Sequence, residues 1–248
     1  MSTITLLIAD DHAIVRQGLR QLLEAAGDIR VIGEAENGRQ AVLETKRLHP
    51  QVVLLDLAMP LLNGVEAARQ IAQEVPAARV LILSCYSDGQ HLRQAVEAGV
   101  AGYVMKETAG NDLLEAIRAA GRGTAFFSPP ILKHLLEQSE KSTANGRPAP
   151  TGPATLSRRQ AEVLQLIAEG HGTKQIAGVL SLSVKTVERH RQTLMDKLNI
   201  HEIATLTRYA VSSGVVESNR IPGWQASSPH PPRKREAILS RRMECSTA

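Results

Sequence analysis

Short β-rich apolar runs alternate with stretches of helical periodicity through the first 125 residues, and this alternation constrains the fold more than any other feature. Strands that alternate with helices form βαβ units, in which the strands are parallel and helices cover both faces of the sheet. The third run is aliphatic until it ends in Asp56, as expected for a central strand covered on both sides. The runs occupy residues 3–9, 30–35, 51–56, 79–84 and 101–105.

Polar residues stand at the ends of four of these runs, and doubly wound sheets bind their ligands at the carboxyl ends of the strands. With the strand order 2-1-3-4-5 the first and third strands are neighbours, so Asp10, Asp11 and Asp56 converge. Two carboxylates ~4 Å apart repel by roughly 4 kcal/mol at an effective dielectric of about 20, so the cluster needs a cation or a proton. Mg²⁺ meets that need and keeps coordination places open for phosphate oxygens. Ser84 and Lys106 would then help to hold a phosphoryl group on Asp56.

Four segments, LLIADDH, VVLLDLAMPLLNGVEA, ILSCYS and GYVMKE, resemble the receiver domain of two-component response regulators over about residues 3–122. The resemblance implies an α/β, flavodoxin-like doubly wound parallel sheet with the strand order 2-1-3-4-5. It also implies that Asp56 accepts a phosphoryl group from the phosphohistidine of a sensor histidine kinase.

The same resemblance assigns roles to the other polar residues. Asp11 would bind Mg²⁺ directly together with Asp56, and Asp10 would act mostly through water. The third protein ligand would be the backbone carbonyl of Ala58, so its methyl side chain is no obstacle. The switch hydroxyl, the switch aromatic residue and the phosphoryl-binding lysine would be Ser84, Tyr103 and Lys106.

The chain changes character after the receiver-like segment, residues 1–125. Residues 126–154 combine a helical extension with a small, polar, proline-rich stretch that predicts a flexible tether. Residues 155–217 show the pattern of four short amphipathic helices. Residues 218–248 are proline-rich and basic, and we expect them to be disordered.

The third C-terminal helix has two distinct faces. An apolar stripe of Val184, Val187, Leu194 and Leu198 is expected to point inward. The opposite face is polar and carries Lys185, Glu188, Arg189, Gln192 and Asp196. A short helix, a tight turn and a longer helix with an exposed polar face describe a helix-turn-helix, whose second helix enters the major groove of DNA.

The segment LSRRQAEVLQLIAEGHGTKQIAGVLSLSVKTVERHRQTLMDKL resembles the LuxR-type four-helix DNA-binding domain over about residues 154–217. Together with the receiver it implies the NarL/FixJ subfamily, with 173–192 as the helix-turn-helix and 184–197 as the recognition helix. The resemblance also places a dimer contact on the helix of residues 202–213, although core packing is a competing use of its apolar residues. The candidate DNA-binding residues are Thr173, Lys174, Val184, Lys185, Thr186, Glu188, Arg189, His190, Arg191 and Gln192.

Composition supports this organisation. The net charge of +4 divides into an acidic front and a basic back, which suggests a polyanion partner for the C-terminal half. Aromatic residues make up 2% of the chain, too few for a stacking platform for single-stranded nucleic acid. Cys85 and Cys245 lie too far apart for a disulfide framework, and no apolar run is long enough to span a membrane. We therefore expect a cytoplasmic protein.

These features predict a bacterial two-component response regulator. It is expected to be a transcription factor that catalyses only its own phosphorylation and dephosphorylation and binds promoter DNA as a homodimer, with RNA polymerase as a candidate partner. Without phosphate, the receiver is expected to mask the recognition helix or the dimer helix. Phosphorylation would draw Ser84 and Lys106 toward Asp56, turn Tyr103 inward and release the DNA-binding domain.

Three alternatives remain open at this level. The receiver could act as an Mg²⁺-dependent adaptor or phosphate sink without productive DNA binding. A metal-dependent phosphatase could use the same acidic cluster, but such enzymes commonly need a second aspartate where this chain has Ala58. A small-molecule-sensing regulator could carry the same C-terminal domain, although the receiver occupies the place of its ligand pocket.

Overall fold

The computed structural model describes residues 3–85, 89–107, 110–129, 131–132, 156–216 and 221. The tether expected within residues 126–154 and almost all of the basic tail expected at 218–248 therefore lie outside the described residues. Ile221 is the described residue of that tail, and it packs against the C-terminal hydrophobic cluster. Within the described ranges, no helix is long and apolar enough to cross a membrane.

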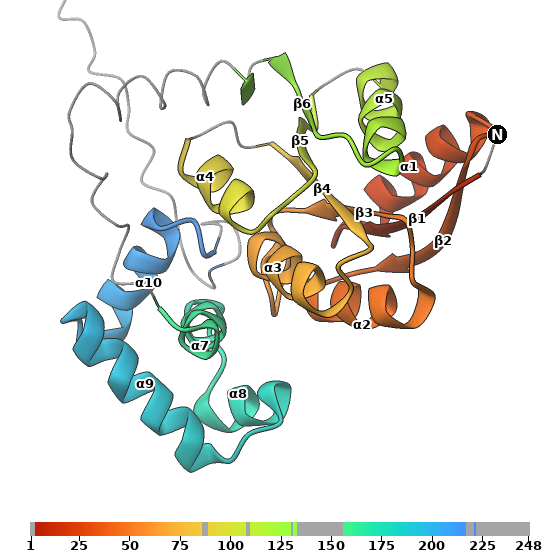
Figure 1. Cartoon of the computed structure of the whole chain (residues 1–248). Coiled ribbons are helices and arrows are strands. Elements are labelled where there is room, and N and C mark those ends of the chain that lie inside the picture. Colours follow the sequence, from red (N-terminus) through yellow and green to blue (C-terminus); the bar gives the residue numbers. More distant parts are fainter. Residues whose placement is uncertain are drawn as a thin grey trace, which may run out of the picture.

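The N-terminal half is built on a parallel sheet of six strands in the order β2-β1-β3-β4-β5-β6 (Figure 1). The order expected for the first five strands is confirmed. The sixth strand was not predicted, because a two-residue strand shows no periodicity and this one lies where a helical extension was expected. The strands are β1 (Ile4–Ala9), β2 (Ile29–Ala35), β3 (Val52–Asp56), β4 (Arg79–Ser84), β5 (Gly102–Met105) and β6 (Phe126–Phe127).

Helices cover both faces of this sheet, with α1 and α5 on one side and α2, α3 and α4 on the other (Figure 1). All of β3 is buried because its side chains alternate between the two layers. Val52 and Leu54 belong to the hydrophobic cluster under α1 and α5, and Val53 and Leu55 belong to the other cluster. The five helices are α1 (Ala13–Ala25), α2 (Gly38–Leu48), α3 (Gly64–Glu74), α4 (Gly89–Glu97) and α5 (Gly110–Gly121).

Four further helices enclose a separate hydrophobic cluster in the C-terminal half. A capping box begins the first of these helices, because the side chain of Ser157 accepts from the backbone of Gln160 and the Gln160 side chain accepts from the backbone of Ser157. Ser181, with φ of 52°, ends the second helix in the left-handed conformation. The helices are α7 (Arg158–Ala168), α8 (Thr173–Leu180), α9 (Val184–Leu198) and α10 (Ile203–Ser212).

The apolar stripe expected on α9 is only partly correct. Val187 and Leu194 are fully buried, but Val184 is 39% exposed. Val184 is the first residue of α9, and side chains tilt toward the N-terminus of a helix, so it projects past the packed neighbours. On α10, Leu206 and Ala210 join the hydrophobic cluster.

Candidate functional site

Three aspartates meet at the carboxyl edge of the sheet. Strands β1 and β3 pair side by side, with Ala9 opposite Leu55, so the residues that follow or end them are neighbours. Asp10, Asp11, His12 and Asp56 each offer one ligand atom, and these atoms all lie within 4.8 Å of one another. Asp10 and Asp56 are almost fully buried, with 1% and 5% exposure. Buried carboxylates at this spacing require positive charge nearby.

Lys106, just beyond β5, supplies part of that charge. Its Nζ lies 2.8 Å from Oδ2 of Asp10 and 3.0 Å from Oδ2 of Asp56. Its backbone N–H donates to the carbonyl of Ser84 at 2.8 Å, which fixes the lysine against the end of β4. Although burial disfavours the ammonium form, the carboxylates of Asp56 and Asp10 raise the pKa of Lys106. The lysine therefore stays charged between two acids.

The surroundings of Asp56 disfavour its ionised form. Burial raises its pKa to about 6, Lys106 offsets part of this effect, and the charge of Asp10 adds to it. The carboxylate is therefore largely ionised at neutral pH, but it is held in an environment that favours added positive charge. A buried carboxylate that stays ionised can act as a nucleophile.

The residues of this cluster fit a hard divalent cation. Three carboxylates supply oxygen donors within coordination reach of one point, and Asp11 is less buried than the other two. Ala58 lies two residues beyond Asp56 in the loop that follows β3, at the same edge of the sheet. This donor set suits Mg²⁺ better than a soft metal, because oxygens dominate it.

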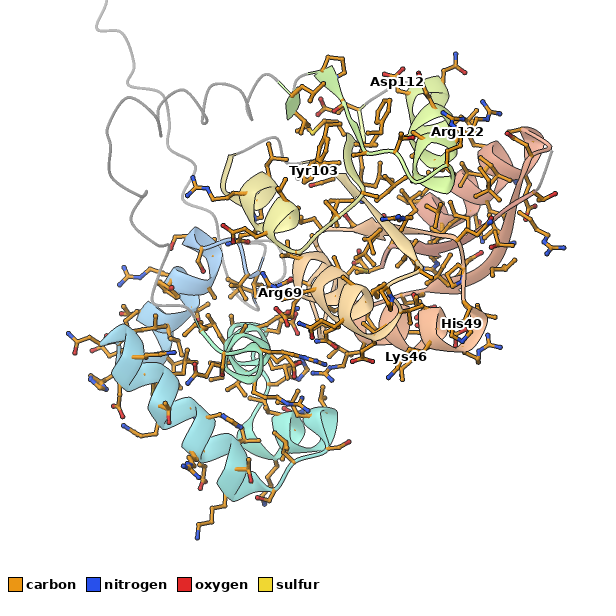
Figure 2. All side chains as sticks on the ribbon, viewed as in Figure 1. Lys46, His49, Arg69, Tyr103, Asp112 and Arg122 are labelled. Carbon is orange, nitrogen blue, oxygen red and sulfur yellow. The ribbon has the colours of Figure 1, made fainter. Side chains whose placement is uncertain are left out.

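The two expected switch residues are both inside the receiver. Ser84 ends β4 and Tyr103 lies on β5, and each is 0% exposed. Tyr103 belongs to the same cluster as Leu92 and Ala95 of α4, and Figure 2 shows its side chain beside the sheet near that helix. The inward position expected for Tyr103 after phosphorylation is thus already occupied in this structure.

The polar face expected on α9 is open to solvent. Lys185, Glu188, Arg189 and Gln192 are all exposed. Thr186 is partly buried, and its backbone N–H donates to the hydroxyl of Ser183 at 3.1 Å. Around them, Lys174 is exposed, and the partly buried candidates are Thr173, His190 and Arg191. The receiver was expected to mask either the recognition helix or the dimer helix. The structure does not show the first of these, because the polar face of α9 is exposed.

Comparison with known families decides between the alternatives. The model for the response regulator receiver domain matches residues 6–118, and the model for the luxR family of bacterial regulatory proteins matches residues 154–210. Response regulator protein VraR of Staphylococcus aureus is 31% identical over 215 residues, which are 87% of this chain and 100% of VraR. The chain belongs to the response regulator family.

Solved structures of response regulators agree with this assignment. RcsB from Salmonella enterica serovar Typhimurium, bound to promoter rprA in the presence of the phosphomimetic BeF3−, is 28% identical with a TM-score of 0.55, over 84% of this chain and 98% of that chain. A LuxR family regulator from Aurantimonas sp. SI85-9A1 is 36% identical with a TM-score of 0.53, over 56% of this chain and 99% of that chain. The protein is thus a NarL/FixJ-type transcriptional response regulator, with a receiver and a LuxR-type DNA-binding domain, rather than an adaptor or a conventional enzyme.

Sequence reasoning missed one residue that shapes the acidic site of this response regulator. Arg16 of α1 is 8% exposed, and its Nη1 donates to the backbone carbonyl of Asp10 at 2.8 Å. Its Nε donates to Glu34 of β2 at 3.1 Å, so the guanidinium ties α1, β2 and the acidic loop together. The local pattern gave no signal for it, because an arginine on an amphipathic helix is mostly exposed.

Proposed function

We propose that this response regulator accepts a phosphoryl group on Asp56 from the phosphohistidine of a sensor histidine kinase. One carboxylate oxygen of Asp56 attacks the phosphorus atom, the P–N bond breaks, and its electron pair stays on the histidine of the kinase. The ammonium of Lys106, 3.0 Å from that carboxylate, is placed to follow the phosphoryl oxygens. Ser84, at the end of β4, would donate its hydroxyl to them, while Tyr103 fills the space behind.

Asp10, Asp11, Asp56 and the carbonyl of Ala58 would hold Mg²⁺. Bound there, the ion would supply positive charge for the transferring phosphoryl group. The chain itself contributes the burial that keeps water away from Asp56 and the arginine that holds the Asp10 backbone in place. On this view the protein catalyses only its own phosphorylation and dephosphorylation.

The C-terminal domain would bind promoter DNA in its double-stranded form as a homodimer, through the exposed face of α9 and the start of α8. RcsB has been solved in complex with DNA. In this chain Lys174 of α8 and the polar face of α9 are exposed. We propose the division 1–125 receiver, 126–154 helical extension and linker, 155–217 DNA-binding domain and 218–248 basic tail. Such a regulator acts in the cytoplasm and can contact RNA polymerase.

One observation carries the proposal: a buried aspartate with a raised pKa shares a lysine with a second buried aspartate at the carboxyl edge of the sheet. The test is incubation of the full chain with acetyl phosphate and Mg²⁺, followed by mass spectrometry and DNA footprinting. Asp56→Asn should lose the acyl phosphate and the phosphorylation-dependent footprint. Asp28→Asn is the matched control, because Asp28 precedes β2 at the opposite edge and pairs with Arg118. Equal labelling of the Asp56→Asn variant would defeat the assignment.

A further inference from the structure

The loop that follows the proposed phosphoacceptor, residues 57–63, makes a tight turn before α3. The backbone N–H of Leu62 donates to the carbonyl of Pro60 at 2.8 Å, which closes a three-residue turn. Leu61 at its centre has φ of 66°, a left-handed conformation that is unfavourable for leucine. We call residues 57–63 the β3–α3 loop. Its backbone geometry needs support from groups around it.

Two side chains of the DNA-binding domain supply that support. The carboxamide of Gln165 accepts from the backbone N–H of Asn63 at 2.8 Å and donates to the carbonyl of Met59 at 3.0 Å, so it spans the loop. Both carboxylate oxygens of Glu169 accept from the backbone N–H of Leu61 at 3.2 Å. Gln165 also donates to Glu169 at 2.8 Å, which joins the two side chains.

These contacts are sheltered from water. Gln165 is 2% exposed, and the Glu169 side chain is 7% exposed. The side chain of Leu61 packs against the hydrophobic cluster of the DNA-binding domain, although the residue belongs to the receiver. Hydrogen bonds in such surroundings are stronger and more costly to lose than exposed ones. The loop beside Asp56 is therefore shaped from across the domain boundary.

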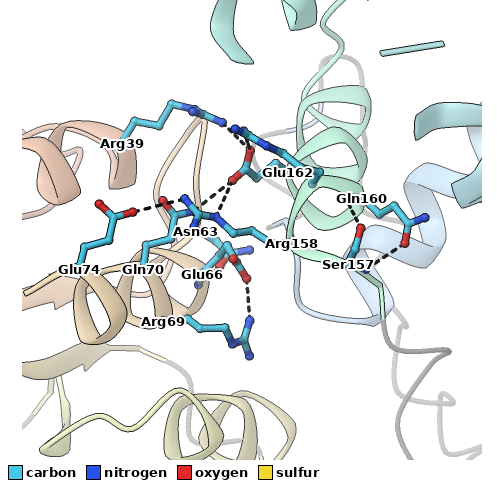
Figure 3. Close-up of polar contacts among 11 residues, drawn as sticks. Arg39, Asn63, Glu66, Arg69, Gln70, Glu74, Ser157, Arg158, Gln160 and Glu162 are labelled. Atoms are coloured by element: carbon cyan, nitrogen blue, oxygen red, sulfur yellow. Dashed lines mark hydrogen bonds and ion pairs between the residues drawn. The ribbon is translucent and has the colours of Figure 1, made fainter. Parts of the chain in front are cut away.

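A second group of contacts fastens the domains without touching the backbone of the loop. Glu162 of α7, 1% exposed, accepts from Arg39 of α2 at 3.2 Å and from Gln70 of α3 at 3.1 Å (Figure 3). Arg158 reaches Glu74 of α3 at 3.7 Å. At the far end, Gln94 of α4 donates to the carbonyl of Ser213 at 3.5 Å. The receiver thus holds α7 and the end of α10, while the polar face of α9 remains exposed.

We propose that Gln165 and Glu169 are positioning residues that restrain the phosphorylation of Asp56, because they hold the β3–α3 loop in the conformation of the unmodified receiver. The inference rests on the proposed function of Asp56 and Ala58. The carbonyl of Ala58, the proposed cation ligand, lies in this loop, and the next carbonyl along the chain, that of Met59, is fixed by Gln165. Phosphorylation also adds negative charge near a loop whose amide is held by the Glu169 carboxylate.

Thermodynamic linkage sets the sign of the effect. If a phosphoryl group at Asp56 weakens the hold of Gln165 and Glu169 on the loop, that hold must disfavour phosphoryl binding by the same factor. Loss of these side chains should therefore make the receiver easier to modify. Damage to the acidic site itself would have the opposite effect, because it would slow the modification of Asp56.

The test uses the full chain with acetyl phosphate as donor and BeF3− as a phosphoryl mimic, both with Mg²⁺. Gln165→Ala and the nearly isosteric Glu169→Gln should each label about tenfold faster, with a BeF3− midpoint about tenfold lower than that of the parent chain. Gln73→Ala, an exposed glutamine on α3, is the matched control and should behave as the parent does. Urea unfolding confirms that each variant is folded.

The possible outcomes separate the two proposals. Folded Gln165→Ala and Glu169→Gln variants that label at or below the parent rate overturn the coupling but leave the phosphoacceptor assignment standing. Failure of the parent chain to label under donor excess overturns that assignment, and the coupling with it. Faster labelling together with an unchanged BeF3− midpoint also rules out the coupling, because linkage requires both to move.

Discussion

The ammonium of Lys106 lies 3.0 Å from the carboxylate of Asp56. The same nitrogen lies 2.8 Å from Asp10, so one cation compensates two nearly buried acids. Removing the charge while keeping a comparable volume, as in Lys106→Met, leaves both carboxylates uncompensated. At neutral pH and without Mg²⁺, we expect the free energy of unfolding to fall by about 3 kcal/mol, as measured by urea titration.

The control for this variant is Lys46→Met, because Lys46 pairs with Glu74 but is half exposed. Exposed ion pairs contribute about 0–1 kcal/mol, so its free energy of unfolding should change little. Added Mg²⁺ should restore part of the stability of Lys106→Met and none of that of the control. Equal losses in the two variants would show that Lys106 does not compensate the acidic cluster.

The raised pKa of Asp56 predicts a pH-dependent stability. Its folded pKa of about 6 lies above the ordinary value of 3.8, so the folded state binds this proton more tightly than the unfolded state. The resulting stabilisation is full below the ordinary value and is lost as the pH rises through 6. Because asparagine resembles the protonated acid, metal-free Asp56→Asn should be more stable than the parent at pH 8, by about 2 kcal/mol.

This advantage should vanish as the pH falls toward the ordinary pKa of an aspartate. Urea unfolding in the presence of a chelator, repeated between about pH 4.5 and 8, measures it. Saturating Mg²⁺ should remove the advantage at pH 8, since a cation stabilises the ionised parent. A constant difference between the two proteins at every pH would contradict the raised pKa.

Close packing of α3 against the phosphoacceptor strand predicts that Gly64 accepts no side chain. A Cβ placed there would lie 2.2 Å from the backbone oxygen of Asp56 and 2.8 Å from the Cα of Leu57. Those are backbone atoms, so the clash cannot be relieved by a rotamer change. Gly64→Ala should lower the free energy of unfolding by about 1–3 kcal/mol and slow the labelling of Asp56.

Gly18 of α1 provides the comparison, because a Cβ there meets nothing within 4 Å. Gly18→Ala should raise the free energy of unfolding by about 0.5–1 kcal/mol, since alanine favours the helix. Calorimetry and acetyl phosphate labelling check both variants. A stable and normally labelled Gly64→Ala would mean that the loop moves more easily than the packing indicates.

The exposed face of α9 predicts separable contributions to DNA binding. Arg189→Ala should weaken binding to a selected duplex by about 1–3 kcal/mol if its guanidinium reads a base edge. Lys185→Ala should weaken binding to all sequences and reduce the salt slope by about one if its ammonium contacts a phosphate. Fluorescence anisotropy over a range of salt concentrations measures both. Arg122→Ala, an exposed arginine of the receiver, is the control and should leave affinity unchanged.

Much of the receiver was predictable from short-range patterns. Alternating runs of strand and helix character define the parallel sheet, and each of the five predicted strands lies within a residue or so of its observed position. The convergence of Asp10, Asp11 and Asp56 then follows from the strand order alone. The capping box of Ser157 and Gln160 was equally readable, because it depends on residues three apart.

Other features depend on contacts that no local pattern encodes. The sequence indicated the residue types at the acidic edge, but only the tertiary structure shows that Lys106 bonds two aspartates at once and that Arg16 supports the backbone of Asp10. Likewise, periodicity predicted that Val184 is buried. It is exposed, because it stands at the N-terminal end of α9, beyond the packed neighbours.

The sequence by itself determined the parallel sheet, its acidic edge and a helix-turn-helix, since these follow from periodicity and from residues close together in the chain. Only the tertiary structure decided that Gln165 and Glu169, more than 100 residues beyond the β3–α3 loop, bond its backbone. A buried glutamine on α7 and the glutamate that caps its C-terminus have no local signature. Their partners are backbone groups of the receiver, and they meet these groups only because the DNA-binding domain docks on the receiver.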